Sequence, residues 1–263
     1  MDDAVVLRGG IANAGAVVRV GDVVFRPRNP NTPTIHALLH HLRDVGFDGV
    51  PVPLGIEPDG RERLEFIPGD VPTPPFPKWS QSDRALATTA SLLRRFHDAQ
   101  SGFVSPPDAS WSEELADPEG GAVICHNDVC PENVVYRDGV AVALLDFDFA
   151  APGRPVYDLA QLAKMCVPLD TQEDAERLGR GGLDPIARLR VVADNYGLPP
   201  GRTDFLDALA SAIANGGEFV RRHVERGDQA FVKMWNTMGG QERYERRDQW
   251  FEQHRQHFAD ALE

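Results

Sequence analysis

Acidic and amide side chains recur at fixed spacing in two short motifs near the middle of the chain. The first reads His126-x-Asp128-x-x-x-x-Asn133, and the second reads Asp146-x-Asp148. Transfer of a phosphoryl group to a hydroxyl needs a carboxylate that orients the hydroxyl and accepts its proton, and oxygen ligands for Mg²⁺. Asp128 fits the first role, and Asn133 and Asp146 fit the second. Asp148 is a candidate metal ligand or supporting group, and His126 is expected to support the loop by hydrogen bonding.

A β-hairpin is predicted between the two motifs. Residues 134–136 are β-rich, residues 137–139 (Arg-Asp-Gly) predict a turn, and residues 140–145 return as a second apolar run. This hairpin carries a candidate metal ligand at each end. Either motif alone is more typical of a strand end or a turn, whereas the two motifs joined in this order are a strong indication of a catalytic site.

With this hairpin between them, the motifs resemble the aminoglycoside phosphotransferase and choline kinase branch of the protein-kinase-like superfamily. Asp158-Leu159-Ala160 and the upstream segment 95–99 (Arg-Phe-His-Asp-Ala) fit the same pattern. The resemblance covers most of the chain and is specific over about residues 123–162. It implies a two-lobed α+β fold, a small β-rich lobe beside a mainly helical one, and a Mg²⁺-dependent kinase that uses ATP or GTP. In this family Asp158 braces the catalytic loop, so its expected role is structural.

The N-terminal segment predicts a glycine-rich hairpin over the nucleotide phosphates. Gly10, Ala12, Gly15 and Val17 lie at the offsets of the kinase G-x-G-x-x-G-x-V loop, with Ala12 in place of the middle glycine. Small residues there let backbone N–H groups approach the phosphates. Within this loop Gly10, Asn13 and Gly15 are expected to contact the nucleotide.

The phosphate-anchoring position of the next strand departs from the resembled family. The family has lysine there, but the first lysine of this chain is Lys78. Strand alternation selects Arg26, because Val24 would face the adenine and Arg26, two residues on, would face the same cleft. A guanidinium is permanently charged and chelates phosphate oxygens. Arg28 has the same parity but follows a proline and is the second choice, and a solvent-facing strand arginine is the alternative.

The helix that follows lacks the glutamate that orients this lysine in kinases. The helix start is predicted with Thr32 as the cap and Pro33 at the first helical position. His36 or His40 could orient Arg26 through a water or a phosphate, although a neutral histidine on such a helix more commonly just packs. The sequence therefore assigns no partner to Arg26.

Two further strands are predicted at residues 51–56 and 64–67, joined by a turn at residues 58–60. The resemblance implies that backbone groups of Glu65 to Ile67 hydrogen-bond the purine. These groups belong to the main chain, so they leave the choice between ATP and GTP open.

A proline-rich segment, residues 71–77, predicts a rigid linker between two lobes. We therefore expect residues 1–68 to form the nucleotide-binding lobe and residues 69–263 to form the helical lobe with the catalytic loop and acceptor site. Helical periodicity in the second lobe marks stretches from residue 82, over 156–165, after 184, over 203–226 and over 241–262.

The composition is that of an ordinary soluble globular protein. The chain has 263 residues, of which 42% are hydrophobic and 25% charged, and no apolar run approaches the ~20 residues of a membrane span. The N-terminus has neither a basic nor an apolar signal region. The three cysteines lack metal-ligand spacing and are expected to be reduced thiols in a cytoplasmic protein, a monomer or a homodimer.

The net charge of −13 argues against nucleic acid as a partner and could attract a cationic co-substrate. Acidic residues between 105 and 121 could form a lip for such a substrate or a solvated loop. The acidity favours a basic, antibiotic-like acceptor over choline, homoserine or a sugar, and the segment after Asp148 is too short to regulate binding of a protein substrate. The alternative from another class is a nucleotide- or ligand-binding pseudokinase without turnover, because the lysine–glutamate pair is missing.

Overall fold

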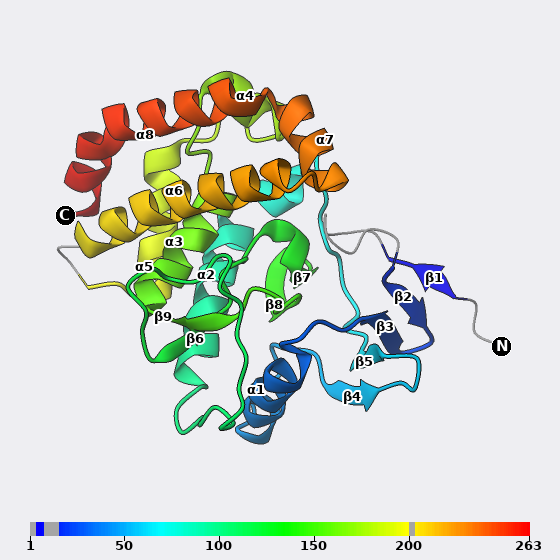
Figure 1. Ribbon diagram of the computed structural model, residues 1–263. Coiled ribbons are helices and arrows are strands. Elements are labelled where there is room, and N and C mark those ends of the chain that lie inside the picture. The colour runs from blue at the N-terminus through cyan, green and yellow to red at the C-terminus, as the bar shows by residue number, and fades with distance from the viewer. Residues whose placement is uncertain (1–3, 8–15, 200–202) are drawn as a thin grey trace.

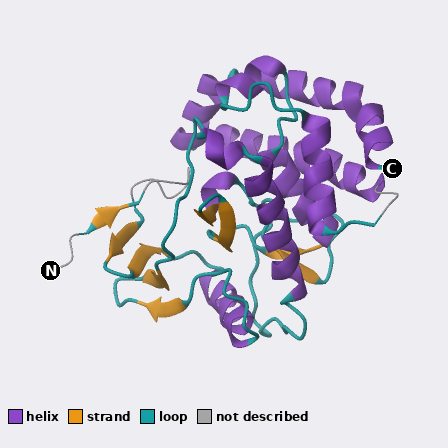
Figure 2. Cartoon of the chain, turned by 180° about the vertical axis from the view of Figure 1, so that it is seen from behind, coloured by secondary structure: helices purple, strands orange, loops and turns teal. Residues whose placement is uncertain are grey.

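The computed structural model describes residues 4–7, 16–199 and 203–263 (Figure 1). Four residues of the predicted phosphate loop, Gly10, Ala12, Asn13 and Gly15, lie outside the described residues. The described chain divides visibly into a small β-rich part near the N-terminus and a larger, mainly helical part (Figures 1 and 2).

The small part is an antiparallel five-stranded sheet with one helix beside it. The strand order is β1-β2-β3-β5-β4. The helix α1 connects β3 to β4 and reaches towards the helical part of the molecule (Figure 1). The bounds are β1 Val5–Val6, β2 Val18–Val20, β3 Val23–Pro27, α1 Thr32–Asp44, β4 Pro53–Ile56 and β5 Arg61–Glu65.

The larger part consists of α-helices packed around two short antiparallel ribbons, β6–β9 and β7–β8. The predicted α+β class is therefore confirmed. The helices are α2 Asp83–Asp98, α3 Pro155–Cys166, α4 Gln172–Arg177, α5 Pro185–Tyr196, α6 Thr203–Glu225, α7 Gln229–Met238 and α8 Gly240–Leu262. The strands are β6 Val123–Cys125, β7 Val134–Arg137, β8 Val140–Leu144 and β9 Ala151–Gly153, and 3₁₀ turns span Lys78–Gln81 and Pro131–Asn133.

One hydrophobic core joins α1 and the segment after it to the helical part. Phe96 of α2 is fully buried, and its ring contacts those of Phe47 and Phe147 at centroid distances of 6.4 Å and 5.7 Å. The backbone N–H of Leu144 donates to the carbonyl of Gly49 at 2.9 Å. Because Phe147 belongs to the second acidic motif, this packing ties the small part to the predicted catalytic hairpin.

Several elements differ from the sequence prediction. The helix α1 begins at Thr32 with Asn31 as its N-cap, so the predicted cap is wrong by one residue. Strand β5 begins at Arg61 rather than at residue 64, because the charged residues Arg61-Glu62-Arg63 lack the apolar alternation that marks a strand. The helix α7 was not predicted, because it follows α6 and precedes α8 after turns of only a few residues.

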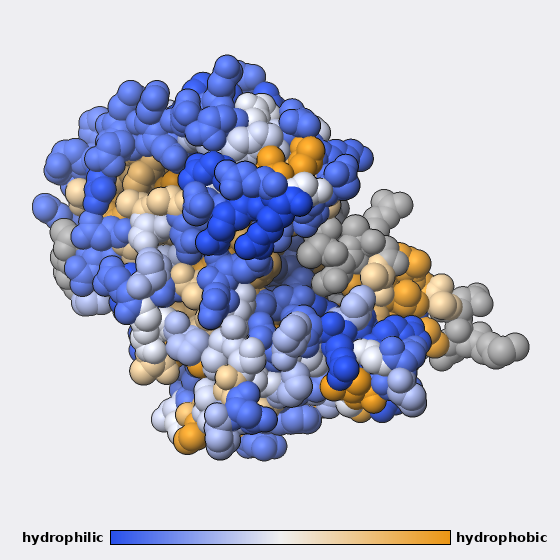
Figure 3. All heavy atoms as spheres, viewed as in Figure 1, coloured by the Kyte–Doolittle hydropathy of each residue, from blue (hydrophilic) through white to orange (hydrophobic). Residues whose placement is uncertain are grey.

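The visible face of the molecule is mainly hydrophilic, with small apolar patches on the β-rich part (Figure 3). Exposed apolar side chains include Val5 and Val6 of the edge strand β1, and Leu54 and Ile56 of the opposite edge strand β4. Among the described residues, none of the helices combines the length and the apolar character that a membrane span requires.

Candidate active site

The loop between β6 and β7 carries the first acidic motif. Asp158, near the start of α3, accepts hydrogen bonds from the backbone of this loop. One carboxylate oxygen of Asp158 accepts the backbone N–H of Asn127 at 2.8 Å, and the other accepts that of His126 at 2.7 Å. His97 Nε2 donates to the same carboxylate at 2.9 Å, and its Nδ1 lies 2.7 Å from the Tyr196 hydroxyl. Asn127 has a positive φ of 63°, so these bonds hold the loop in a conformation that it would otherwise disfavour.

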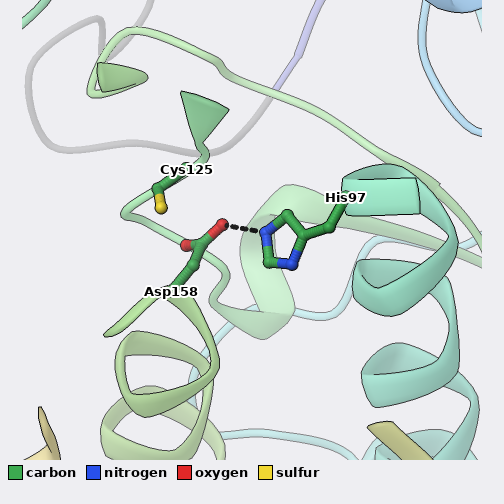
Figure 4. Close-up of side chains that lie close together, drawn as sticks. All are labelled: His97, Cys125 and Asp158. Atoms are coloured by element: carbon green, nitrogen blue, oxygen red, sulfur yellow. Dashed lines mark hydrogen bonds and ion pairs between the residues drawn. The ribbon is translucent and has the colours of Figure 1, made fainter. Parts of the chain in front are cut away.

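His97, Cys125 and Asp158 lie within 4.8 Å of one another, a spacing that could suggest a metal site (Figure 4). Both oxygens of Asp158 already accept hydrogen bonds. Burial raises the pKa of the Cys125 thiol well above its usual value, and its Sγ lies 3.4 Å from the carbonyl of Arg154. A neutral thiol and a saturated carboxylate are poor metal ligands, so this cluster is a structural brace.

Replacing Asp158 by asparagine is expected to destabilise the fold by about 3–5 kcal/mol, because it leaves buried donors without their anionic acceptor. The matched control is Asp98→Asn, which removes an exposed ion pair with Arg94 and should cost less than about 1 kcal/mol. Urea unfolding of both variants measures the difference. A cost for Asp158→Asn no larger than that of the control would contradict a bracing role.

The pH dependence of unfolding provides a second readout. Burial alone would raise the pKa of Asp158, but the hydrogen bond and charge of His97 outweigh it and lower that pKa below its ordinary value. A carboxylate with a depressed folded pKa contributes stability that is present above its unfolded pKa, about 3.9, and lost as the pH falls through the folded value. Asp158→Asn should therefore flatten this acid limb of the stability curve.

Asp128 is half-buried on this loop, and Asn133 holds it in place. The side-chain amide of Asn133 donates from Nδ2 to Asp128 Oδ2 at 2.8 Å and to the Asp128 carbonyl at 3.0 Å. The backbone N–H of Asp128 donates to His126 Nδ1 at 3.3 Å, and His126 Nε2–H donates to the Leu145 carbonyl at 2.8 Å. One carboxylate oxygen of Asp128, Oδ1, has no hydrogen-bond partner within the described chain.

The electrostatic surroundings of Asp128 favour a carboxylate that can accept a proton. Burial raises its pKa to about 7, and repulsion from Asp146 adds to this shift. Attraction by Lys164 and the hydrogen bond from Asn133 act in the opposite direction. Burial in turn lowers the pKa of Lys164 to about 8, although Asp128 acts to raise it. A base poised near neutral pH suits general base catalysis.

The hairpin β7–β8 brings Asn133 and Asp146 together, as the sequence predicted from their spacing. Asn133 directly precedes β7, Asp146 follows β8, and the Leu145 N–H donates to the Asn133 carbonyl at 2.8 Å. The side-chain Oδ1 of Asn133 has no hydrogen-bond partner among the residues that the structure describes, and the Asp146 side chain is 32% exposed. Neutral and anionic oxygen atoms of this kind fit the preference of Mg²⁺.

Arg26 of β3 reaches the same carboxylates from the small sheet. Its NH1 lies 3.0 Å from Asp146 Oδ1, its NH2 is ion-paired with Asp148, and its Nε lies 3.0 Å from Glu62 Oε1. Arg26 is 7% exposed, whereas Arg28 is exposed. Although burial opposes the charge, the three carboxylates raise the pKa of Arg26 above its ordinary value. Of the two candidate arginines, the structure brings only Arg26 to the acidic motifs.

Glu62 is the site residue that the sequence did not identify. It is 4% exposed on β5, directly across from Arg26 in the antiparallel register, and its Oε2 lies 2.8 Å from His36 Nε2 on α1. His40, the other candidate on α1, is exposed. The sequence prediction placed Glu62 outside the strand. Glu62 could have been identified from the sequence if the strand had been predicted to start at Arg61 and to pair with β3.

Some of the backbone groups that were predicted to bind the purine at the end of β5 already form hydrogen bonds within the protein. Val24 is half-buried on the same face of β3 as Arg26. The Glu65 N–H donates to the Val52 carbonyl, and the Phe66 N–H donates to a carbonyl in the β2–β3 turn, both at 2.9 Å. These two donors are therefore committed to the sheet. The Ile67 N–H has no partner among the described residues and remains open to a ligand.

The acidic loop between residues 105 and 121 is partly paired with basic side chains. Asp117 and Glu119 both form ion pairs with Arg154 at 2.7 Å, and Glu114 lies 3.3 Å from His223 of α6. Glu113 of the same loop is exposed, and no ion pair joins it to another described residue. The loop is therefore only partly neutralised within the protein.

Two sequence comparisons point to one family. The model of the phosphotransferase enzyme family, APH, matches residues 108–192, which contain both acidic motifs. A trifolitoxin immunity protein of Rhizobium leguminosarum bv. trifolii is 36% identical over 215 residues, which are 80% of this chain and 80% of that protein.

Solved structures of the same fold cover nearly the whole chain. An aminoglycoside 2'-phosphotransferase-IIIa in complex with GDP is similar with a TM-score of 0.63 at 15% identity, covering 98% of this chain and 93% of that one. A choline/ethanolamine kinase family protein from Mesorhizobium loti has a TM-score of 0.59 at 16% identity, covering 94% and 91%. A macrolide 2'-phosphotransferase from Brachybacterium faecium has a TM-score of 0.54 at 19% identity, covering 88% and 90%. The fold is therefore the two-lobed protein-kinase-like fold.

Proposed function

The chain belongs to the phosphotransferase enzyme family, and from this we propose that it moves the γ-phosphoryl group of ATP or GTP to a hydroxyl of a small molecule. The observation that carries the proposal is the convergence of Asp128, Asn133, Asp146 and Arg26 on one site, drawn from both parts of the fold. These are the groups that phosphoryl transfer to an alcohol requires.

Asp128 is the proposed catalytic base. Asn133 occupies its Oδ2, and this leaves Oδ1 to orient the acceptor hydroxyl and to take its proton. In the transfer, a bond forms between the acceptor oxygen and the γ-phosphorus, and the bond from the γ-phosphorus to the β–γ bridging oxygen breaks. Asp128 holds the reacting hydroxyl in line and takes its proton, so it contributes both positioning and general base catalysis.

Asn133 and Asp146 are the proposed Mg²⁺ ligands, and Asp148 is a supporting group. When bound, Mg²⁺ supplies positive charge that neutralises the nucleotide phosphates as charge develops on them. Arg26 is the proposed phosphate anchor of the nucleotide, with NH1 and NH2 directed towards the acidic motifs. Gly10, Asn13 and Gly15 as phosphate contacts, and Val24, Glu65 and Ile67 as base contacts, complete the proposed nucleotide site.

We place the boundary between the nucleotide-binding and acceptor-binding lobes near residue 68, and we propose a cytoplasmic location, where nucleotide is available. The proposed acceptor is a hydroxyl of an antibiotic or toxin. The relative from Rhizobium is named for immunity to trifolitoxin, and two similar structures are phosphotransferases of antibiotics. The acidic loop is partly paired with Arg154 and His223, so its charge alone does not select a strongly cationic acceptor, and macrolide-like and peptide antibiotics stand beside aminoglycosides.

The test is nucleotide consumption by the purified protein with Mg²⁺ across aminoglycosides, macrolides, peptide and nucleoside antibiotics, choline, ethanolamine, homoserine and sugars. Mass spectrometry of each acceptor identifies a phosphorylated product. We expect turnover with at least one antibiotic. Turnover with choline or ethanolamine alone would instead indicate a metabolite kinase. Metal-dependent nucleotide binding without turnover on the whole panel would favour the ligand-binding pseudokinase.

A further inference from the structure

The guanidinium of Arg26 contacts Glu62 along the edge that carries Nε. Its Nε lies 3.0 Å from Glu62 Oε1, while NH1 and NH2, at the other edge, point to Asp146 and Asp148. The side chains of Arg26 and Glu62 are 9% and 6% exposed. The contact at Nε is an ion pair without an aligned hydrogen bond. Its effect is to orient the side chain so that both terminal nitrogens face Asp146 and Asp148, where the nucleotide phosphates are proposed to bind.

Glu62 is in turn anchored by the helix α1. Its second oxygen lies 2.8 Å from Nε2 of His36, whose side chain is 12% exposed. Strands β3 and β5 pair in register, with Arg26 opposite Glu62, so backbone hydrogen bonds set the distance between the two side chains. His36 of α1 therefore contacts Glu62 of β5, which contacts Arg26 of β3. Arg26 in turn contacts the acidic motifs.

We propose that Glu62, anchored by His36, is the positioning residue that holds Arg26 in the orientation needed to bind the nucleotide phosphates. This inference rests on the proposed phosphotransferase function. The carboxylate that orients Arg26 then lies on strand β5, whereas the sequence comparison with kinases expected a glutamate on α1. The helix α1 contributes His36 instead, which contacts this carboxylate.

The geometry of the two cations explains why the carboxylate lies on a strand. A lysine ammonium is a single point charge whose three N–H donors rotate freely, whereas a guanidinium is a planar fork with donors on two edges. A carboxylate on the adjacent strand meets Nε from the side, and the outer edge of the fork then faces the acidic motifs. Glu62 can therefore orient an arginine through its Nε edge, which a lysine lacks. We expect Glu62 and Arg26 to act together.

Glu62→Gln removes the charge and keeps the shape of the side chain. We expect the dissociation constant of the Mg²⁺–nucleotide complex, measured by calorimetric titration, to rise about 10- to 100-fold. The KM for the acceptor should change less than about twofold, since Arg26 is proposed to bind the nucleotide rather than the acceptor. The matched control is Glu57→Gln, which removes an ion pair with Arg63 at 2.9 Å on the exposed side of the same sheet. This control should bind nucleotide as the wild type does.

A double-mutant cycle separates positioning from a general structural role. If Glu62 acts through Arg26, then Arg26→Lys combined with Glu62→Gln should bind nucleotide about as weakly as the weaker single variant. Additive losses, or nucleotide affinity of Glu62→Gln within about twofold of the wild type, would overturn the proposal. A wild-type protein that binds no nucleotide would refute the phosphotransferase function itself, together with this inference.

His36→Leu keeps the proposal testable if Glu62→Gln does not fold, because it removes the anchor and leaves the carboxylate in place. It should raise the nucleotide dissociation constant in the same direction by a smaller factor. His40→Leu, at the exposed position one turn further along α1, is its control. Equal nucleotide affinity in these two variants would contradict the contribution of α1.

Discussion

Asp128→Asn is expected to reduce kcat by about 10²- to 10⁴-fold while nucleotide binding remains close to that of the wild type. The amide keeps the shape of the side chain but cannot accept the proton of the attacking hydroxyl. The hydrogen bond from Asn133 Nδ2 to Asp128 Oδ2 shows which oxygen is already occupied and leaves Oδ1 for the acceptor. The loss should therefore fall on turnover.

The measurement is steady-state turnover with the acceptor found in the panel, together with calorimetric titration of Mg²⁺–nucleotide. Asp138→Asn is the control, because Asp138 lies in the exposed turn of the neighbouring hairpin. Full turnover by Asp128→Asn would exclude Asp128 as the base. Loss of nucleotide binding in the same variant would instead indicate that Asp128 supports the nucleotide site.

Asp146→Asn is expected to lower kcat/KM for nucleotide by about three orders of magnitude, since a bound metal contributes several kcal/mol of charge stabilisation. It should also remove most of the dependence of nucleotide affinity on Mg²⁺. Asp146 is one of the two proposed oxygen ligands brought together by the β7–β8 hairpin, and it also pairs with NH1 of Arg26. The effect should therefore appear in nucleotide binding as well as in turnover.

Titration of nucleotide at several Mg²⁺ concentrations separates these contributions. Asp146 and Asp138 both have positive φ, 61° and 51°, so Asp138→Asn controls for the same exchange in the same backbone conformation. If Asp146→Asn still binds nucleotide with the Mg²⁺ dependence of the wild type, the metal ligands have been assigned wrongly.

The sequence predicted the catalytic hairpin well, because its signals are local. Residues 134–136 and 140–144 are continuous apolar, β-rich runs, and Asp138-Gly139 adopts the positive φ values that a tight hairpin turn needs. The same argument placed Asn133 and Asp146 at neighbouring ends, which the backbone hydrogen bond from Leu145 to Asn133 realises. Local periodicity also gave the starts of α2, α3 and α5 to within about one residue.

The sequence could not predict the partner of Arg26, because that partner depends on pairing between strands distant along the chain. The alternation of side chains along β3 was sufficient to select Arg26, without knowledge of any other strand. Finding Glu62 required the register of β5 against β3, and the start of β5 is hidden by three consecutive charged residues, Arg61-Glu62-Arg63. Their pattern indicates a solvated turn until the burial of Glu62 against α1 is known.

The partial neutralisation of the acidic loop likewise could not be read from the sequence. Arg154 lies more than thirty positions from Asp117, and the antiparallel pairing of β6 with β9 brings the two together. Net charge alone favoured a cationic acceptor. The charge that an acceptor meets depends on which carboxylates remain unpaired.

The measurement that tests the central claim most directly follows a radioactive γ-phosphate from the nucleotide in the presence of Mg²⁺, the wild-type protein and the acceptor found in the panel. We predict that the label moves to a phosphate ester on an acceptor hydroxyl, one phosphoryl group for each nucleotide consumed, and that Asp128→Asn slows this transfer by about 10²- to 10⁴-fold. Label recovered only as inorganic phosphate or on the protein itself would contradict a small-molecule O-phosphotransferase.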